Sequence, residues 1–311
     1  MHLRIGTRGS ALALAQTKKV VDLLMQHNDG LEIEQVVIKT RGDVARDEPL
    51  HRMEGMGFFV RELDEALVRD EIDLAVHSMK DIPTIRPPGT ITAAVLERES
   101  PYDCLISRDG AKIDELPVGA LIGTSSLRRA AQLKRAYPEL SVIPMRGNIP
   151  TRLRRLDEGR CDGVVLAEAG LIRMGWNIER QTLPPNHFLP SCNQGVIACV
   201  CIQHSDAHEL LAQLDHARTR IETELERRVM EVLGGGCLVP MGVLALMKKS
   251  KVELIAEVLS LDGSQHIRSD TLIPINANAG QRLRLADALA KTIAESGGAE
   301  LIKLAKRGTE G

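Results

Sequence analysis

Short β-type runs alternate with helix-periodic runs through the first two thirds of the chain. HLRIGT, LEIEQVVIKT, IDLAVHS and ITAAVLE have the composition of strands. Two runs between them, ALALAQTKKVVDLLMQHN and FFVRELDEALVRDE, repeat apolar residues at helical spacing. Such alternation is typical of an α/β fold, so we expect a mostly parallel sheet with helices on its faces.

A second set of the same kind follows. ALIGTSS, LSVIPMR and DGVVLAEAG are predicted strands, with helices at SLRRAAQLKRAY and TRLRRLDEG. The apolar run VIACVCI, residues 196–202, predicts a fully buried strand that carries the chain back into the first unit. We therefore expect two α/β domains, the first from residues 1–96 with 197–215 and the second from residues 97–196.

The pattern changes in the last third. Three strand-like runs, MGVLALM, KVELIAEVLS and QHIRSDTLI, precede the helical run AGQRLRLADALAKTIAE. Asp262 and Gly263 predict a hairpin turn between the last two strands. Residues 216–311 are therefore expected to form a small C-terminal α+β domain.

Composition narrows the classes of partner. With 43% hydrophobic residues, 26% charged residues and a formal net charge of -2, the chain resembles an ordinary soluble protein with no global attraction to nucleic acid or anionic membranes. No apolar run is long enough for a membrane span, and the N-terminus lacks a signal-peptide pattern. Six irregularly spaced cysteines without a CxxC pair favour a reducing compartment, so we expect a cytoplasmic protein.

Arginines are concentrated between residues 128 and 155. This stretch contains seven arginines and Lys134, against the single acidic residue Glu139. Because guanidinium groups bind carboxylates or phosphates through paired hydrogen bonds, the stretch predicts a polyanionic partner. The alternative for Arg128, Lys134 and Arg135 is ordinary solvated surface charge. Nucleic acid is disfavoured as the partner, because the chain has only three Phe, two Tyr and one Trp to stack on bases.

Polar motifs follow several predicted strands, at the sheet edge where ligands bind in parallel sheets. GTSSLRR places Thr124, Ser125 and Ser126 at a helix start, where they suit an anion or serve as ordinary caps. A cation at Arg129 opposes the helix dipole there, a conflict that a bound anion would remove.

In HSMKD, Asp81 is the acid/base candidate, and the alternative is a turn-forming role before Ile-Pro. His77 of the same motif is interpreted as a strand residue.

LGGGC, residues 233–237, places three glycines before Cys237. One interpretation is a presented thiol whose surroundings are cleared of side chains. The other is a helix C-cap followed by a buried cysteine, although a cap requires only one glycine.

No metal site is expected, because Cys199 and Cys201 have no second ligand pair at zinc spacing.

Together, and in this order, RIGTRGSALALAQ, KTRGD, FFVRELDEAL, DLAVHSMKD, GTSSLRR, MRGN, RLRRLDEG, LAEAGL and LGGGC resemble the porphobilinogen deaminases, also called hydroxymethylbilane synthases. The resemblance implies three domains, the first two built like the halves of a type II periplasmic binding protein. It implies a transferase of tetrapyrrole (heme) biosynthesis that joins four porphobilinogen molecules with loss of ammonia and releases linear hydroxymethylbilane by hydrolysis. It also implies a dipyrromethane cofactor on a thioether at Cys237. Nothing in the sequence suggests an obligate interface, so we expect a monomer, without nucleic-acid or membrane partners.

The resemblance assigns site residues by motif position. Asp81 corresponds to the catalytic carboxylate, which handles protons and stabilises the cation formed when ammonia leaves. The implied cofactor-binding residues are Cys237, Lys80, Asp81, Thr124, Ser126, Arg128, Arg129, Arg146 and Gly147. The implied substrate-binding residues are Arg8, Ser10, Ser78, Arg146, Arg152 and Arg173.

Several positions depart from the family pattern. Met56 in GMGFF and Arg52 stand where lysines are common, Asn193 in NQGV where a glycine is common, and Val200 where a glutamate is common.

Two other classes remain open at this point. A two-lobed solute-binding protein would bind an anion without chemistry but needs no cysteine loop, and a nucleic-acid-binding protein would use the arginine-rich stretch with steep salt dependence.

Overall fold

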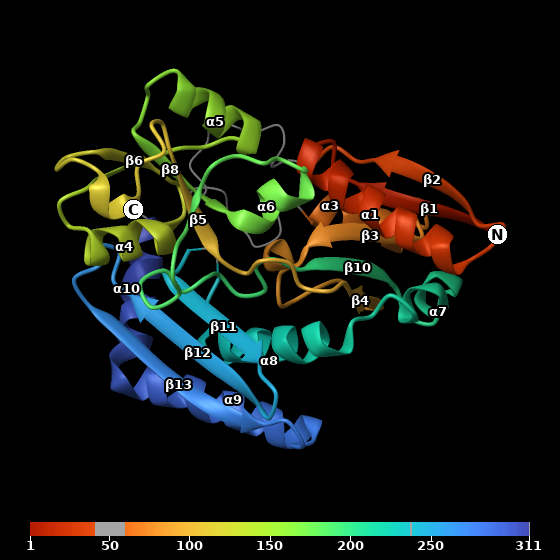
Figure 1. The fold of residues 1–311 in the computed structure, drawn as a ribbon. Coiled ribbons are helices and arrows are strands. Elements are labelled where there is room, and N and C mark those ends of the chain that lie inside the picture. Colours follow the sequence, from red (N-terminus) through yellow and green to blue (C-terminus); the bar gives the residue numbers. More distant parts are fainter. Residues whose placement is uncertain (41–59, 237, 311) are drawn as a thin grey trace.

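The computed structural model describes residues 1–40, 60–236 and 238–310. Figure 1 shows three lobes, each built on its own sheet. The first lobe contains the five-stranded sheet β2-β1-β3-β10-β4, and the second contains the five-stranded sheet β7-β6-β8-β5-β9. The third contains the sheet β11-β12-β13. The fold class expected from the sequence is confirmed.

The first sheet is mixed. In it, β1 pairs in parallel with β2 and β3, whereas β10 runs antiparallel between β3 and β4. The strands are β1 (His2–Thr7), β2 (Glu32–Val37), β3 (Leu74–Ser78), β4 (Thr90–Val95) and β10 (Ile197–Ile202), and the helices are α1 (Ala11–His27), α3 (Arg61–Val68) and α7 (Asp206–Ala212).

Strand β10 is buried on both faces. Cys199 and Cys201 pack in one hydrophobic cluster with Val20 and Leu24 of α1. Their neighbours Ala198 and Val200 pack in another cluster, which includes the α3 residues Leu63, Ala66 and Leu67. The predicted return of the chain through a fully buried strand is therefore confirmed.

The second sheet repeats the order of the first. Here β6 pairs in parallel with β7 and β8, and β5 is antiparallel to β8 and β9. The strands are β5 (Asp103–Ser107), β6 (Leu121–Gly123), β7 (Ser141–Ile143), β8 (Gly163–Ala167) and β9 (Gln181–Thr182), with the 3-10 turn η3 (Ile113–Glu115) and helices α4 (Leu127–Ala136), α5 (Ile149–Asp157) and α6 (Glu168–Arg173). Strands β5 and β9 are not predicted by the sequence patterns, because β9 is two residues long and the apolar core of β5 is only residues 104–106.

The third sheet is antiparallel, and its helices share one hydrophobic cluster with it. Val243 and Leu254 of the strands pack in this cluster with Val229, Ile293 and Ile302 of the helices. The predicted hairpin joins β12 and β13, with Gly263 at φ 75°. The elements are α8 (Ala217–Leu233), β11 (Met241–Met247), β12 (Lys251–Leu259), β13 (His266–Pro274), α9 (Ala279–Ile293), the π-type turn η4 (Ala294–Gly298) and α10 (Ala299–Glu310).

Two segments cross between the first and second lobes, after β4 and before β10. They lie side by side, because Glu99 N–H donates to Gly195 O at 3.0 Å and Leu96 N–H donates to Ile197 O at 3.0 Å. A Cβ on Gly195 would lie 2.6 Å from Ser100 O, so the segments also approach closely. Helices α1 and α6 meet across the two lobes (Figure 1).

None of the helices in the described part of the chain is long and apolar enough to span a membrane.

Candidate active site

Asp81 lies directly beyond the carboxyl end of β3, in the 3-10 turn η2 (Met79–Asp81). It lines a pocket, called here the Asp81 pocket, whose other lining residues are Arg8, Ser10, Leu12, Ala13, Gln16, Val60, Val76, His77 and Ser78. The structure thus brings four sequence-predicted residues together, namely Arg8, Ser10, Ser78 and Asp81. Gln16 orients one of them, because its Nε2 donates to Ser78 Oγ at 2.8 Å.

Lys80 occupies the same turn and is surrounded by charges from the second lobe. Burial lowers the pKa of its ammonium to about 8; Asp81 and Asp103 oppose this shift, whereas Arg128 and Arg129 add to it. Nζ donates to Gln194 Oε1 at 3.4 Å. The lysine beside Asp81 therefore lies where the first lobe faces the start of α4.

Asp103, at the start of β5, holds the two arginines of GTSSLRR. Its Oδ2 accepts from Arg128 Nη1 at 2.8 Å, and its Oδ1 accepts from Arg129 Nη2 at 2.7 Å. All three side chains are buried. Despite burial, the two guanidinium groups hold the pKa of Asp103 well below its usual range. Solvated surface charge is therefore wrong for Arg128, whereas Lys134 and Arg135 are exposed.

The anion that Arg129 was expected to need at the helix start is thus supplied inside the protein by Asp103. Arg129 also donates from Nη1 to Val165 O at 3.1 Å. The capping interpretation of GTSS is confirmed for Ser126, which is the N-cap of α4 and whose Oγ accepts from Arg129 N–H at 3.4 Å. Thr124 Oγ1 accepts from Ser126 N–H at 3.2 Å. Ser125 Oγ, in contrast, is buried without a hydrogen-bond partner.

Arg152, on α5, lies among like charges. Burial, together with the charges of Arg129, Arg146 and Arg155, lowers the pKa of its guanidinium to about 10. Its Nε donates to Gly147 O at 2.8 Å, and Arg155 Nη1 donates to Arg146 O at 3.0 Å, so these arginines also hold the loop between β7 and α5. Such a cluster of cations favours an anion with several carboxylates.

Arg173, at the end of α6 in the second lobe, lies close enough to Asp81 of the first lobe for their charges to interact. Its Nε donates to Glu99 Oε2 at 2.5 Å, and Lys19 Nζ of α1 donates to the other oxygen of Glu99 at 2.6 Å. Burial lowers the pKa of Arg173, and the charges of Glu99 and Asp81 oppose the shift. Arg173 Nη2 is buried without a hydrogen-bond partner.

Cys237, the predicted attachment residue, lies outside the described residues. The glycines before it have local roles. Gly234 is the C-cap of α8 at φ 64°, so the capping interpretation holds there. A Cβ on Gly235 would lie 2.1 Å from Met241 Cε. Helix capping therefore accounts for one of the three glycines.

Two departures from the family pattern fit their surroundings. Asn193 has φ 61°, a conformation that Gly adopts freely and that Asn tolerates better than most residues. Val200 is fully buried in β10. Arg52 and Met56 lie outside the described residues.

Asp103 and Gln194 are the residues that the sequence patterns missed. An acidic residue at the start of a buried apolar run was the available signal for Asp103, since such a charge must be paired. Gln194 had no comparable signal. Within residues 1–40, 60–236 and 238–310, no group of three or more His, Cys, Asp or Glu side chains is arranged to hold a metal ion.

Comparisons with known families cover nearly the whole chain. Residues 3–210 match the family model described as "Porphobilinogen deaminase, dipyromethane cofactor binding domain". Residues 220–295 match the model described as "Porphobilinogen deaminase, C-terminal domain".

Curated relatives give the same result. The chain is 47% identical over 301 residues to the probable porphobilinogen deaminase of Methanococcoides burtonii, covering 96% of each chain. It is 39% identical over 308 residues to the porphobilinogen deaminase of Desulforamulus reducens, covering 98% of each. Among solved structures, the second substrate-binding domain of a putative amino acid ABC transporter from Streptococcus pneumoniae matches with a TM-score of 0.43 and 12% identity, over 68% of this chain and 91% of that chain.

Proposed function

The chain belongs to the porphobilinogen deaminase family, and we propose that its reaction takes place at the Asp81 pocket with Asp81 as the catalytic carboxylate. The protein is an enzyme of tetrapyrrole biosynthesis with a dipyrromethane cofactor binding domain. The observation that carries the proposal is the convergence on one pocket of Asp81, Arg8, Ser10 and Ser78, which come from two loops at the carboxyl edge of the first sheet.

The described residues fit a cofactor that bears several carboxylates. The buried donors without an acceptor in the described part of the chain include Ser125 Oγ, Arg128 Nε and Arg173 Nη2. Arg152 faces three further arginines. We propose that Lys80, Thr124, Ser126, Arg128, Arg129, Arg146 and Gly147 hold dipyrromethane attached at Cys237. When bound, this group supplies the primer on which the pyrrole chain is built.

The substrate's groups match the remaining side chains. Porphobilinogen carries an acetate, a propionate and an aminomethyl group, and we propose that Arg8, Ser10, Ser78, Arg146, Arg152 and Arg173 bind its carboxylates. The amine binds in its protonated form beside Asp81. Ammonia then leaves with the electrons of the C–N bond, and the carboxylate of Asp81 stabilises the positive charge that develops on the substrate's pyrrole ring. A carboxylate suits this role because the charge it faces is positive.

The finer course of the reaction is proposed on the same basis. Four porphobilinogen units are joined with loss of ammonia, and linear hydroxymethylbilane is released by hydrolysis.

We propose domain boundaries at residues 1–96 with 197–215, 97–196 and 216–311, supported by the membership of the strands in three separate sheets. We also propose a cytoplasmic monomer, and the free thiols of Cys104, Cys161, Cys192, Cys199 and Cys201 support a reducing compartment.

The test is ammonia release from porphobilinogen by the cofactor-loaded protein. We expect Asp81→Asn and Asp81→Ala to lower the rate at least ~100-fold, the usual contribution of a catalytic acid or base. Asp157→Asn, at an exposed position of α5, is the matched control and should retain the wild-type rate. A rate within about threefold of wild type for Asp81→Ala, less than 1 kcal/mol of barrier, would exclude the catalytic role.

A further inference from the structure

The side-chain amide of Gln194 lies between two groups of opposite charge from different lobes. Its Oε1 accepts from Lys80 Nζ of the first lobe at 3.4 Å. Its Nε2 donates to Asp103 Oδ1 of the second lobe at 2.9 Å and to Pro101 O at 2.9 Å. An amide has one accepting and one donating end, so it can link a cation to an anion with the correct polarity at both. Gln194 is 1% exposed; its contacts with Asp103 and Pro101 are buried, and its contact with Lys80 is partly buried.

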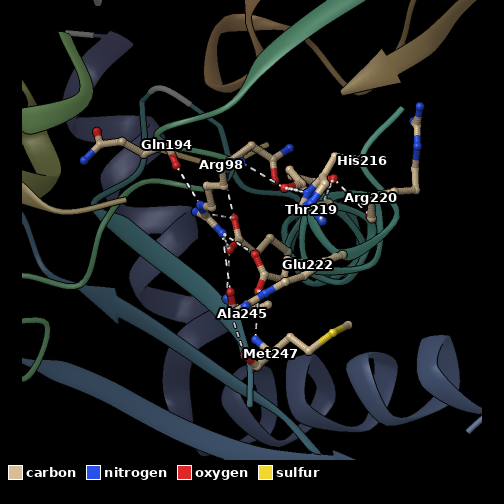
Figure 2. Close-up of polar contacts among 12 residues, drawn as sticks. Arg98, Gln194, His216, Thr219, Arg220, Glu222, Ala245 and Met247 are labelled. Atoms are coloured by element: carbon tan, nitrogen blue, oxygen red, sulfur yellow. Dashed lines mark hydrogen bonds and ion pairs between the residues drawn. The ribbon is translucent and has the colours of Figure 1, made fainter. Parts of the chain in front are cut away.

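The backbone of Gln194 is held by an ion pair that reaches the third lobe. Arg98 Nε donates to Gln194 O at 3.0 Å, and Arg98 Nη1 donates to Glu226 Oε1 at 2.6 Å. The same carboxylate accepts from Asn193 N–H at 2.6 Å and from Ala245 N–H of β11 at 2.8 Å. Figure 2 shows Arg98 between Gln194 and Ala245. Gln194 is thus anchored to all three lobes.

We infer that Gln194 is a positioning residue, which holds the Lys80 ammonium in place beside Asp81 and favours its charged form. The inference rests on the proposed role of the Asp81 pocket. Gln194 lies on the segment that enters β10. Its Oε1 accepts from Lys80 and Ser191, and its Nε2 donates to Asp103 and Pro101. It therefore acts on the reaction through Lys80 and not through the substrate.

The surroundings of Lys80 make its charge sensitive to this one contact. The charged groups that face it are Asp81 of its own turn, Asp103 of β5, and Arg128 and Arg129 of α4. Burial leaves the pKa of Lys80 at about 8, so small changes alter its protonation near neutral pH. A hydrogen bond accepted from an ammonium stabilises the charged form, so removal of the Gln194 carbonyl lowers this pKa, whereas a carboxylate in its place raises it.

Two variants of similar size test the inference in opposite directions. Gln194→Met removes the amide, and Gln194→Glu replaces it with a carboxylate. The first readout is the titration midpoint of Lys80, followed by NMR of 13C-labelled lysine and assigned as the signal that Lys80→Arg removes. We expect the midpoint to fall by about half a pH unit or more in Gln194→Met and to rise by a similar amount in Gln194→Glu. The basic limb of the kcat/KM profile for porphobilinogen should move in the same directions.

Controls separate this inference from the proposed function. Gln213 is exposed, so Gln213→Met and Gln213→Glu should leave the Lys80 midpoint unchanged. Equal or absent shifts of the midpoint in the two Gln194 variants would overturn the inference. If Gln194→Met does not fold, Gln194→Glu decides alone, since an unchanged or lowered midpoint contradicts the inference. The midpoint does not depend on turnover, so it distinguishes failure of this inference from failure of the role of Asp81.

Discussion

Two nitrogens of Arg129 donate to one carboxylate oxygen of Asp103, with Nε at 3.0 Å and Nη2 at 2.7 Å from Oδ1. The pair joins the first turn of α4 to the start of β5 inside the second lobe. Because both groups are buried, either one left alone would be an uncompensated charge.

This pair predicts a large loss of stability on removal of the carboxylate. Asp103→Ala leaves Arg128 and Arg129 buried without their counter-charge, and we expect the free energy of unfolding in urea to fall by about 3–5 kcal/mol. Asp109→Ala, at an exposed position, is the control and should be neutral. A loss below about 1 kcal/mol for Asp103→Ala would mean that the arginines find other partners.

Arg152 predicts a separation between stability and substrate binding. In Arg152→Gln the repulsion with Arg129, Arg146 and Arg155 is relieved while the hydrogen bond to Gly147 O is lost, so the midpoint of thermal unfolding should change little. The KM for porphobilinogen should increase about tenfold or more, since a charged hydrogen bond to a carboxylate contributes roughly 1.5–3 kcal/mol. Arg154→Gln, on the exposed side of α5, should leave KM unchanged. An unchanged KM in Arg152→Gln would remove Arg152 from the binding site.

His77 predicts a pH dependence of stability. It is buried with no hydrogen-bond partner for Nε2, and burial lowers the pKa of its imidazole from 6.5 to about 3, with Arg86 and Arg8 adding to the effect. The unfolded chain therefore binds a proton that the folded protein does not. The stabilisation is complete above pH 6.5 and is lost as pH falls toward 3, by about 1.4 kcal/mol per pH unit.

The measurement is urea unfolding at several pH values between 6.5 and 4.5, a window above the range in which most carboxylates titrate. His77→Gln lacks the titrating group, so its free energy of unfolding should decline less steeply with falling pH than that of wild type. His187→Gln, at an exposed position, is the control and should keep the wild-type slope. Identical slopes for wild type and His77→Gln would show that His77 is not responsible.

Cys237 predicts a covalent mass. The intact protein, made in cells with tetrapyrrole synthesis and weighed under denaturing conditions, should exceed its translated mass by two linked pyrroles. Cys237→Ser should lack this excess, whereas Cys161→Ser, at a buried free cysteine, should retain it. Retention of the excess in Cys237→Ser would place the attachment at another residue.

Local patterns in the sequence were sufficient for most of the architecture. Periodicity located α1 and the alternation of β1, β2 and β3, and the apolar run of β10 indicated burial on both faces. The motifs at strand ends indicated the edge of the sheet at which Arg8, Ser10, Ser78 and Asp81 meet. These features depend on residues that are close together along the chain. The periodicity of the sequence is therefore enough to predict them.

Tertiary structure alone decided how the charges are shared. The arginine-rich stretch gave no indication that Arg128 and Arg129 are paired with Asp103 while Arg152 faces other cations. Nor did any local pattern distinguish Gln194, whose contacts reach Lys80 and Asp103 from distant parts of the sequence. The sequence determined which residue types lie at each strand end. Their partners depend on how two lobes and two crossing segments pack, because electrostatic energy depends on distance and burial in space and not on separation along the chain.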